Sequence, residues 1–309
     1  IRIKMPVDED ISFTDIIRGD VHFNSGQSDD KVLLKADGMP TYHLAVVVDD
    51  YLMKITHAFR GEEWLPSAPV HIMLWKYLGW HADMPQWAHL PLIMKPDGKG
   101  KLSKRDGDRL GFPVFAMDWQ DPKTGETTKG FKERGFLPAA FNNMLALLGW
   151  NDGTEQEIFS LEELIEKFSL DRVHKGGAKF NYEKAKWFNH EWIKRSDDGF
   201  LAGILQKKLQ ENNIEGSFPL EKICALIKER CTFLTELWEN SYFFFRSPEN
   251  VDLDAIKGKW NEDIKGFFIE LTEAYKNAED SFSAATLKTL FESLATEKNI
   301  KTRDLLLPF

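Results

Sequence analysis

The spacing of the apolar residues changes along the chain, and this change constrains the fold more than any other feature. Before residue 96, short apolar runs, many with a period near two, alternate with turns that contain glycine or proline. From Pro138 onward, apolar residues recur at intervals of three and four in one segment after another. The first pattern is typical of strands with short helices, and the second of amphipathic helices. The chain is therefore predicted to be α/β at first and all-α afterwards.

Length and composition place the chain among ordinary globular proteins. Its 309 residues are enough for two or three domains. Hydrophobic residues make up 42% of the chain, which excludes extensive disorder, and no apolar run is long enough to span a bilayer. The N-terminus, Ile1 to Lys4, is unlike a signal peptide. We therefore expect a cytoplasmic protein.

The charge balance and the cysteines exclude two further classes. A net charge of −9 argues against a protein that coats nucleic acid indiscriminately, because phosphate binding depends on Lys and Arg, although it leaves room for local basic patches. Cys224 and Cys231 lie seven residues apart in one predicted helix and have no metal-ligand companions. We expect two buried, reduced thiols and no metal site.

The first part is predicted in more detail from its turns and apolar runs. Residues 1–35 favour short strands and hairpins, and for residues 41–50 two alternatives stay open: a helix start that leads into a loop and a short strand, or a simple buried strand. The chain then predicts a strand at 52–61, a helix at 69–78 and a strand at 89–94. This order with short links predicts a parallel pair of strands joined by a right-handed crossover.

A basic cluster, Lys101 to Arg105, follows the last of these strands through the turn Pro96 to Gly100. Three cations in five residues, beside glycines that let a backbone approach closely, suit the phosphates of a nucleotide. A solvated basic turn is the commoner explanation of such a segment when it is taken alone. The strand before it, the glycines around it and a second polar cluster upstream favour the nucleotide site.

The second part is predicted to consist of helices after one exposed hairpin or loop at residues 109–130. Pro138 marks one helix start, Ser160 with Glu163 forms a capping box, and Asn181 is an N-cap. Further helices are predicted at 201–209, 219–238, 261–275 and 283–294.

The polar clusters upstream each have an ordinary structural explanation beside a functional one. Arg60 lies just past a strand and has the planar fork that suits a carboxylate, although a surface or ion-paired role is more frequent. Tyr42 with His43 fits a half-buried aromatic pair, and Asp49 with Asp50 fits a helix cap as well as a metal bound with a phosphate. The sequence contains no nucleophile-and-base arrangement that we can defend and no complete glycine-rich P-loop.

Four ordered motifs resemble the bacterial glutamyl-tRNA synthetases, a family of class I aminoacyl-tRNA synthetases. They are Asp37 to Ala45, Val47 to Asp50, Arg60 to Ser67 and Lys101 to Arg105. The last resembles the Lys-Met-Ser-Lys-Ser signature of the class, with Leu102 in place of Met and Arg105 in place of the final Ser. Further matches downstream are Gly135 to Pro138, Leu147 to Trp150 and Lys186 to Asn189.

The resemblance covers nearly the whole chain but not the whole family pattern. The other class I signature, His-Ile-Gly-His, is absent from these 309 residues, and so is the N-terminal strand of the family that bears an arginine. We therefore expect a fragment, truncated at both ends and inactive by itself. The implied fold is the second half of a class I Rossmann-type catalytic domain, followed by helical stem-contact and anticodon-binding domains. The implied boundaries are 1–95, 96–196 and 197–309.

The resemblance also implies a reaction and its residues. The parent enzyme would join glutamate to ATP, with Mg²⁺, as glutamyl adenylate and transfer it to tRNA(Glu). Lys104 would contact the phosphates on a mobile loop, assisted by Lys101 and Ser103. The ATP site would also contain Leu102, Arg105, Glu63, Leu92 and Ile93. Glutamate would be bound by Tyr42, Arg60, Trp64 and Val46, where many relatives have Asn in place of Val46.

The helical part implies the remaining partner. Arg230, seven residues after Ile223 in the predicted helix 219–238, would contact the tRNA anticodon, although a solvent-exposed helix arginine is nearly as frequent an explanation. The resemblance further implies a monomer without membrane contact. Two alternatives stay open: a non-catalytic tRNA-binding module, and an enzyme similar to glutaminyl-tRNA synthetase, whose anticodon module is β-rich.

Overall fold

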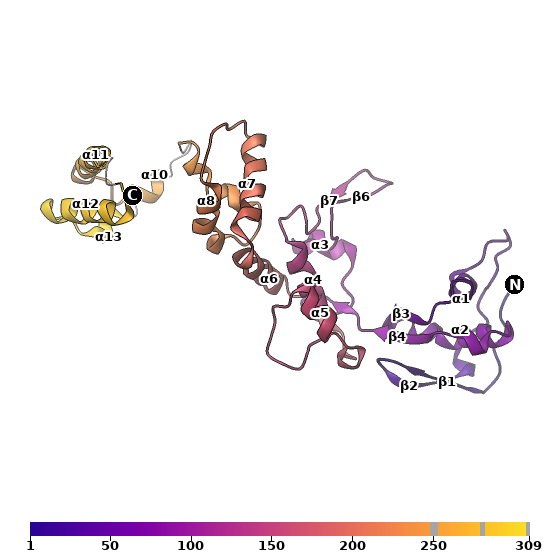
Figure 1. The fold of residues 1–309 in the computed structure, drawn as a ribbon. Coiled ribbons are helices and arrows are strands. Elements are labelled where there is room, and N and C mark those ends of the chain that lie inside the picture. Colours follow the sequence, from indigo (N-terminus) through magenta and orange to yellow (C-terminus); the bar gives the residue numbers. More distant parts are fainter. Residues whose placement is uncertain (248–252, 279–281, 307–309) are drawn as a thin grey trace. The chain divides into compact units, whose positions relative to one another are not determined.

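The computed structural model describes residues 1–247, 253–278 and 282–306. The chain divides into two compact units, Ile1–Ser241 and Tyr242–Phe309, which are treated separately below. Figure 1 labels their helices and strands in chain order.

A four-stranded sheet with the order β2-β1-β4-β3 forms the base of the first unit. Strands β1 (Asp10–Asp15) and β2 (Gly19–Asn24) form an antiparallel hairpin, as predicted for this part of the chain. Gly19 makes its tight turn with a φ of +78°, which favours glycine. Strand β3 (His57–Gly61) lies parallel to β4 (Gln86–Leu90), which confirms the predicted parallel pair. Both strands therefore end at the same edge of the sheet.

Two helices pack against this sheet, and one of them corrects an expectation. The sequence left two alternatives for residues 41–50: a helix start that leads into a loop and a short strand, or a buried strand. Both are wrong, because helix α1 (Tyr42–Leu52) runs without a break through residues 45–48. Val47 is fully buried in the core with the second helix, and this packing outweighs the strand propensity of three successive valines. Helix α2 (Ala68–Tyr77) agrees with the predicted helix.

Both predicted strands around α2 differ from the expectation in their bounds. Residues 52–56 end α1 and turn at Lys54, whose φ of +55° is incompatible with a strand, so β3 begins only at His57. The strand predicted at 89–94 is divided into β4 and β5 (Ile93–Met94) by Pro91, which has no N–H for a ladder. Strand β5 pairs in parallel with the distant β8 (Ala178–Lys179), so the basic cluster does follow a parallel strand.

Helices are the main regular structure of the remaining first unit, as predicted. A two-stranded hairpin of β6 (Trp119–Gln120) and β7 (Thr127–Thr128) lies within residues 109–130. Buried side chains that include Phe112, Phe136 and Phe188 form a second core. The helices are α3 (Lys104–Leu110), α4 (Pro138–Ala146), α5 (Leu161–Lys167), α6 (Tyr182–Arg195), α7 (Asp198–Glu211), α8 (Leu220–Ile227) and α9 (Glu236–Glu239).

The single helix predicted at 219–238 is wrong. Helix α8 ends at Ile227, a short 3₁₀ turn covers Lys228–Arg230, and the backbone is extended at Cys231. Two tertiary hydrogen bonds hold the next residues outside a helix. The Asn189 amide donates to the carbonyl of Thr232 (2.6 Å), and the N–H of Leu234 donates to the carbonyl of Gly135 (2.9 Å). The two cysteines are free and buried, as expected, but they do not share a helix.

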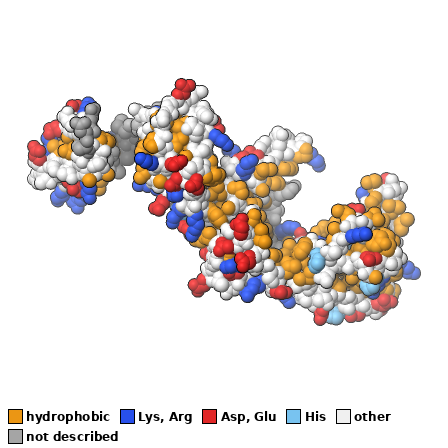
Figure 2. All heavy atoms as spheres, viewed as in Figure 1, with side chains coloured by type: hydrophobic (Ala, Val, Ile, Leu, Met, Phe, Trp, Pro, Cys, Tyr) orange, Lys and Arg blue, Asp and Glu red, His pale blue; other side chains and the backbone are white. Residues whose placement is uncertain are grey.

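The second unit is helical in its described residues. Its elements are α10 (Leu253–Ile256), α11 (Glu262–Lys276), α12 (Ala284–Glu297) and α13 (Thr302–Leu305). Helices α11 and α12 confirm the two helices predicted there, and Phe267 and Leu305 are completely buried between them and their neighbours. Among the described residues, no helix combines the length and apolarity that crossing a bilayer requires. Figure 2 shows Lys and Arg interspersed with Asp and Glu on the visible face.

Candidate functional site

The carboxyl ends of β3 and β4 carry a buried arginine. Arg60 extends from β3 with only 8% of its side chain exposed. Its Nη2 donates to Oδ2 of Asp50 on α1 (3.2 Å), and its Nη1 donates to Nδ1 of His71 on α2 (2.9 Å). The guanidinium also lies 5.5 Å from the ring centroid of Trp87 on β4. Four elements therefore fix its position.

Helix α2 places His71 behind this arginine. Every residue from Ala68 to Trp75 is buried, and His71 has no exposed surface. Burial lowers the pKa of His71 to about 3, and the nearby charge of Arg60 acts in the same direction. The ring is therefore neutral at physiological pH, and its Nε2 lies 3.0 Å from Nδ1 of His43.

Two aromatic rings line the exposed side of the arginine's surroundings. Tyr42 and Trp64 have ring centroids 4.4 Å apart, and Tyr42 also lies 6.1 Å from the His71 ring. They are 43% and 37% exposed, so both can contact a small molecule. Val46 lies one turn along α1 and packs, partly buried, against the first core. The structure thus links Tyr42 to Arg60 through His71, and Trp64 to Tyr42.

A cavity of about 260 Å³ lies beside this arrangement, at the ends of β3 and β5. One wall consists of apolar side chains from the helical part, among them Phe131, Met144 and Phe180. The rest of the lining includes five residues that are predicted to contact ATP, namely Glu63, Leu92, Ile93, Lys101 and Leu102.

An ion pair connects the two polar members of this cavity. The Lys101 ammonium donates a hydrogen bond to the Glu63 carboxylate, and this bond lowers the pKa of Glu63. Both side chains remain accessible, with 56% of Lys101 and 35% of Glu63 exposed. Such a pair contributes about 0–1 kcal/mol to stability, so a ligand can replace it at little cost.

The sequence predicts a loop for the second half of the basic cluster, but these residues begin a helix. Ser103 is the N-cap of α3, and Asp106 accepts hydrogen bonds from its N–H (2.9 Å) and hydroxyl (2.5 Å). Asp106 also faces Lys95 (3.3 Å) and Arg109 (2.9 Å). The hydrogen bond from Ser103, followed by that from Arg109, lowers the pKa of Asp106 far below its usual range. The side chains of Lys104 and Arg105 lie outside the part of the chain that the structure describes.

Sequence reasoning missed Asp106 and His71, and it placed Glu62 past the end of a strand without giving it a role. Asp106 could have been found, because an acidic residue three positions after a serine is a capping-box pattern. Glu62 orients the edge of the sheet by accepting from Arg18 (2.6 Å) and from the N–H of Leu92 (3.3 Å). For His71 the only signal was one histidine inside an apolar helix, which is more often a structural residue.

Arg230 lies apart from these residues. It is exposed and belongs to the 3₁₀ turn after α8, not to a helix face as predicted. It lines none of the cavities described here.

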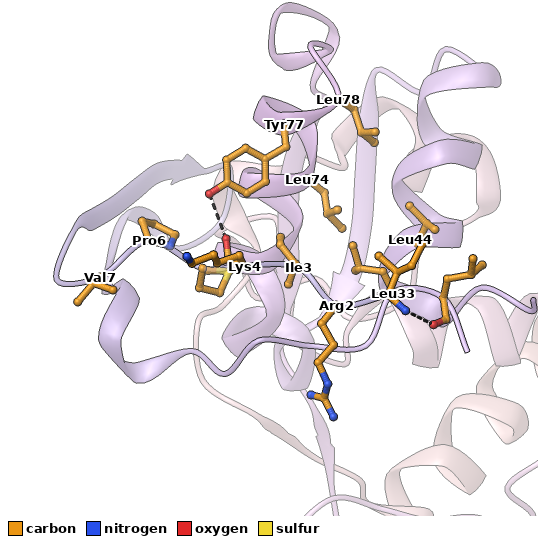
Figure 3. A pocket seen from close by; sticks show the side chains of 13 residues that line it. Arg2, Ile3, Lys4, Pro6, Val7, Leu33, Leu44, Leu74, Tyr77 and Leu78 are labelled. Atoms are coloured by element: carbon orange, nitrogen blue, oxygen red, sulfur yellow. Dashed lines mark hydrogen bonds between the residues drawn. The ribbon is translucent and has the colours of Figure 1, made fainter. Parts of the chain in front are cut away.

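Two larger cavities contain none of the predicted site residues. One, of about 730 Å³, lies at the start of the chain between Ile1 to Val7 and the ends of α1 and α2 (Figure 3). Its lining is mainly apolar, and the Tyr77 hydroxyl donates to the Lys4 carbonyl there (3.1 Å). The other, of about 630 Å³, lies near Tyr51 and Gln86, at the opposite end of β4 from Leu90. Across the described residues, no group of three or more His, Cys, Asp or Glu is arranged to hold a metal ion.

Comparison with known proteins identifies the class to which this architecture belongs. The family described as "tRNA synthetases class I (E and Q), catalytic domain" matches residues 1–187, and the "Anticodon binding domain" family matches residues 182–309. The chain therefore belongs to the class I tRNA synthetases of the E and Q group. This confirms the predicted fold class of a class I catalytic domain followed by a helical anticodon-binding domain.

The similar proteins are glutamate–tRNA ligases. The chain is 49% identical over its whole length to that of Christiangramia forsetii and 51% identical to that of Flavobacterium johnsoniae, and it covers 61% of each. A crystal structure of the glutamate tRNA ligase from Elizabethkingia meningosepticum, in complex with its amino acid, is also similar, with a TM-score of 0.91 and 46% sequence identity. The match covers 99% of this chain and 61% of the chain in that crystal structure. The chain thus spans about 61% of the length of these relatives.

Proposed function

We propose that the protein is a glutamate–tRNA ligase that activates glutamate with ATP and transfers it to tRNA(Glu). The observation that carries the proposal is the pairing of two neighbouring sites at one edge of the parallel strands. One holds the buried cation Arg60 beside Tyr42 and Trp64, and the other is the cavity between Glu63 and Lys101. A carboxylate substrate and a nucleotide would meet between them.

Arg60 favours glutamate over glutamine as the substrate. A guanidinium with 8% exposure that already has the carboxylate of Asp50 on one side still has N–H donors for a second acceptor. A substrate carboxylate would form a charge-assisted hydrogen bond with these N–H groups, whereas an amide would form only a weaker, neutral one. The alternative of an enzyme similar to glutaminyl-tRNA synthetase is therefore disfavoured.

In the proposed mechanism the protein positions reactants and stabilises charge. The glutamate α-carboxylate attacks the α-phosphate of ATP, forming glutamyl adenylate and releasing pyrophosphate. Lys104 would contact the phosphates as charge develops, with Lys101, Ser103 and Arg105 beside it. Leu92, Ile93 and Leu102 would contact the adenosine, and Glu63 would accept a hydrogen bond from its ribose or base. Mg²⁺ would arrive with the phosphates, because it is often bound by substrate oxygens and only one or two carboxylates.

The domain limits of 1–95, 96–196 and 197–309 stay a prediction. Within them, we propose that the helical part contacts the tRNA. Arg230 is an exposed cation in this part, which suits a phosphate or a base edge. We further propose that Val46, which lies one turn from Tyr42 on α1, contacts the amino acid. We also propose that the protein is a cytoplasmic monomer.

The test uses the full-length gene product. Glutamate-dependent exchange of pyrophosphate into ATP and binding of tRNA(Glu) are measured for the wild type, Lys104→Ala and the control Lys99→Ala. We expect Lys104→Ala to reduce exchange by about 10²–10³, by analogy with the loss of one preorganised donor, without loss of glutamate binding. Exchange that is unchanged in Lys104→Ala would contradict the role of Lys104. A wild type that binds tRNA but shows no exchange would instead indicate a non-catalytic tRNA-binding module.

A further inference from the structure

A chain of three side chains extends from the buried arginine into the first core. Arg60 on β3 contacts His71 on α2, and His71 contacts His43 on α1. The two contacts are 2.9 Å and 3.0 Å long, so both are hydrogen bonds of ordinary length.

The direction of these hydrogen bonds follows from the chemistry of arginine. A guanidinium has only donors, so Nδ1 of His71 must be the acceptor and carries no proton. A neutral imidazole then has its proton on Nε2, which donates to Nδ1 of His43. The order of donation is therefore Arg60 to His71 to His43.

A protonated His71 is incompatible with this arrangement. The imidazolium would point an N–H at the Arg60 N–H and place two positive charges in contact. Its other titratable neighbours do not favour a charged ring either. The charges of His43 and His89, like that of Arg60, lower the pKa of His71.

The two partners of Arg60 differ in what they do to its charge. Asp50 compensates the charge, whereas a neutral imidazole orients the guanidinium without compensating it further. A second carboxylate in place of His71 would accept from the same N–H but add a second negative charge beside Asp50, which would repel an acidic substrate.

We infer that His71 is the positioning residue for Arg60: it accepts a hydrogen bond at Nδ1, orients the guanidinium without adding a negative charge, and leaves the remaining N–H groups for the side-chain carboxylate of the substrate. The inference rests on the proposed function in so far as that substrate is glutamate. The hydrogen bond itself does not depend on the substrate.

The first test observes the tautomer directly. The protein is labelled with ¹⁵N-histidine, and two-bond ¹H–¹⁵N correlations are recorded from pH 5 to pH 8, with His71→Asn used to assign the signal. We expect His71 to remain neutral with its proton on Nε2 throughout. A signal with the proton on Nδ1, or one that titrates in this range, would overturn the inference.

The second test separates positioning from a structural role. His71→Leu removes the acceptor at similar volume, whereas His71→Asn restores an acceptor near the position of Nδ1. In the full-length gene product we expect His71→Leu to raise the KM for glutamate by about 10- to 100-fold and to leave the KM for ATP unchanged. His71→Asn should recover most of this loss, and the exposed control His81→Leu should have no effect.

The outcomes distinguish this inference from the proposed function. Equal losses in His71→Leu and His71→Asn, or a rise in both KM values, would indicate a structural role and overturn the inference. A wild type without glutamate-dependent exchange would contradict the proposed function alone, and the NMR experiment would then decide whether His71 positions Arg60.

Discussion

Arg60 and Lys101 are both cations predicted to hold a substrate, and the structure surrounds them differently. Arg60 is 8% exposed and is held by a carboxylate, an imidazole and an aromatic ring from three other elements. Lys101 is 56% exposed and has one ion-pair partner, Glu63. A buried and fully oriented cation can discriminate between substrates, because its geometry is fixed before binding. An exposed cation can exchange one anion for another.

The difference follows from the position of each residue in the fold. Arg60 is near the end of β3, where α1 and α2 pack against the sheet and exclude water. Lys101 lies between the turn after β5 and the helix α3, where most of its side chain stays in contact with water. We therefore expect changes at Arg60 and His71 to have large effects on substrate binding or stability, and a change at Lys101 to have a small effect on stability.

The largest effect is expected for Arg60→Gln. In the full-length gene product this change should reduce the preference for glutamate over glutamine by about 10²–10³, because the buried guanidinium at the proposed side-chain site is lost. Pyrophosphate exchange with each amino acid measures this preference. Arg195→Gln is the control, since it removes an arginine that is paired with a glutamate on α6, outside the proposed site. An unchanged preference in Arg60→Gln would contradict the assignment.

A smaller effect is expected on the pH dependence of stability. The pKa of His71 is about 3 in the folded protein, whereas that of an ordinary histidine, as in the unfolded chain, is 6.5. As the pH falls, His71 is therefore protonated in the unfolded chain before it is protonated in the folded protein. The unfolded state is thereby favoured below pH 6.5. Between pH 7 and pH 5 the free energy of unfolding should fall by about 2 kcal/mol more in the wild type than in His71→Asn.

Urea denaturation at pH 7, 6 and 5, followed by tryptophan fluorescence, measures this difference. Trp75 and Trp87 are buried in the same core as the helix that carries His71 and so report its unfolding. Equal pH dependence in the two proteins would mean that His71 is protonated as readily in the folded protein as in the unfolded chain.

The smallest effect is expected for Lys101→Met. The free energy of unfolding should change by less than about 1 kcal/mol, because an exposed ion pair contributes little and is screened by salt. The pKa of Glu63 should rise toward its ordinary value, because the hydrogen bond from Lys101 that lowers it is lost. A carboxyl ¹³C titration measures this pKa, and Lys99→Met in the same exposed turn is the control. A large loss of stability would mean that the two cations differ less than their exposure indicates.

The sequence predicted the helices with local signals well. The capping box at Ser160 and Glu163, the N-cap Asn181 and the start at Pro138 are all observed, because each depends on neighbours within one turn. The failures lie where distant contacts decide. Val47 becomes helical by packing in the core, and the helix after Pro219 ends at Ile227, ahead of the segment whose Thr232 carbonyl accepts from Asn189.

The candidate site shows the same division. Motifs identified Tyr42, Arg60, Glu63 and Lys101, because these types of residue recur in one order in a known family. They gave no indication that Asp50 and His71 would surround Arg60, since these two residues belong to helices on either side of β3 in the chain. No local pattern contains that information.

The sequence by itself determined the family, the change from α/β to helical structure and the residue types available to bind a carboxylate and phosphates. Only the tertiary structure decided which cation is buried and oriented and which is exposed. The physical reason is that charge and hydrogen-bonding capacity belong to a residue wherever it lies, whereas desolvation and geometry depend on what packs around it.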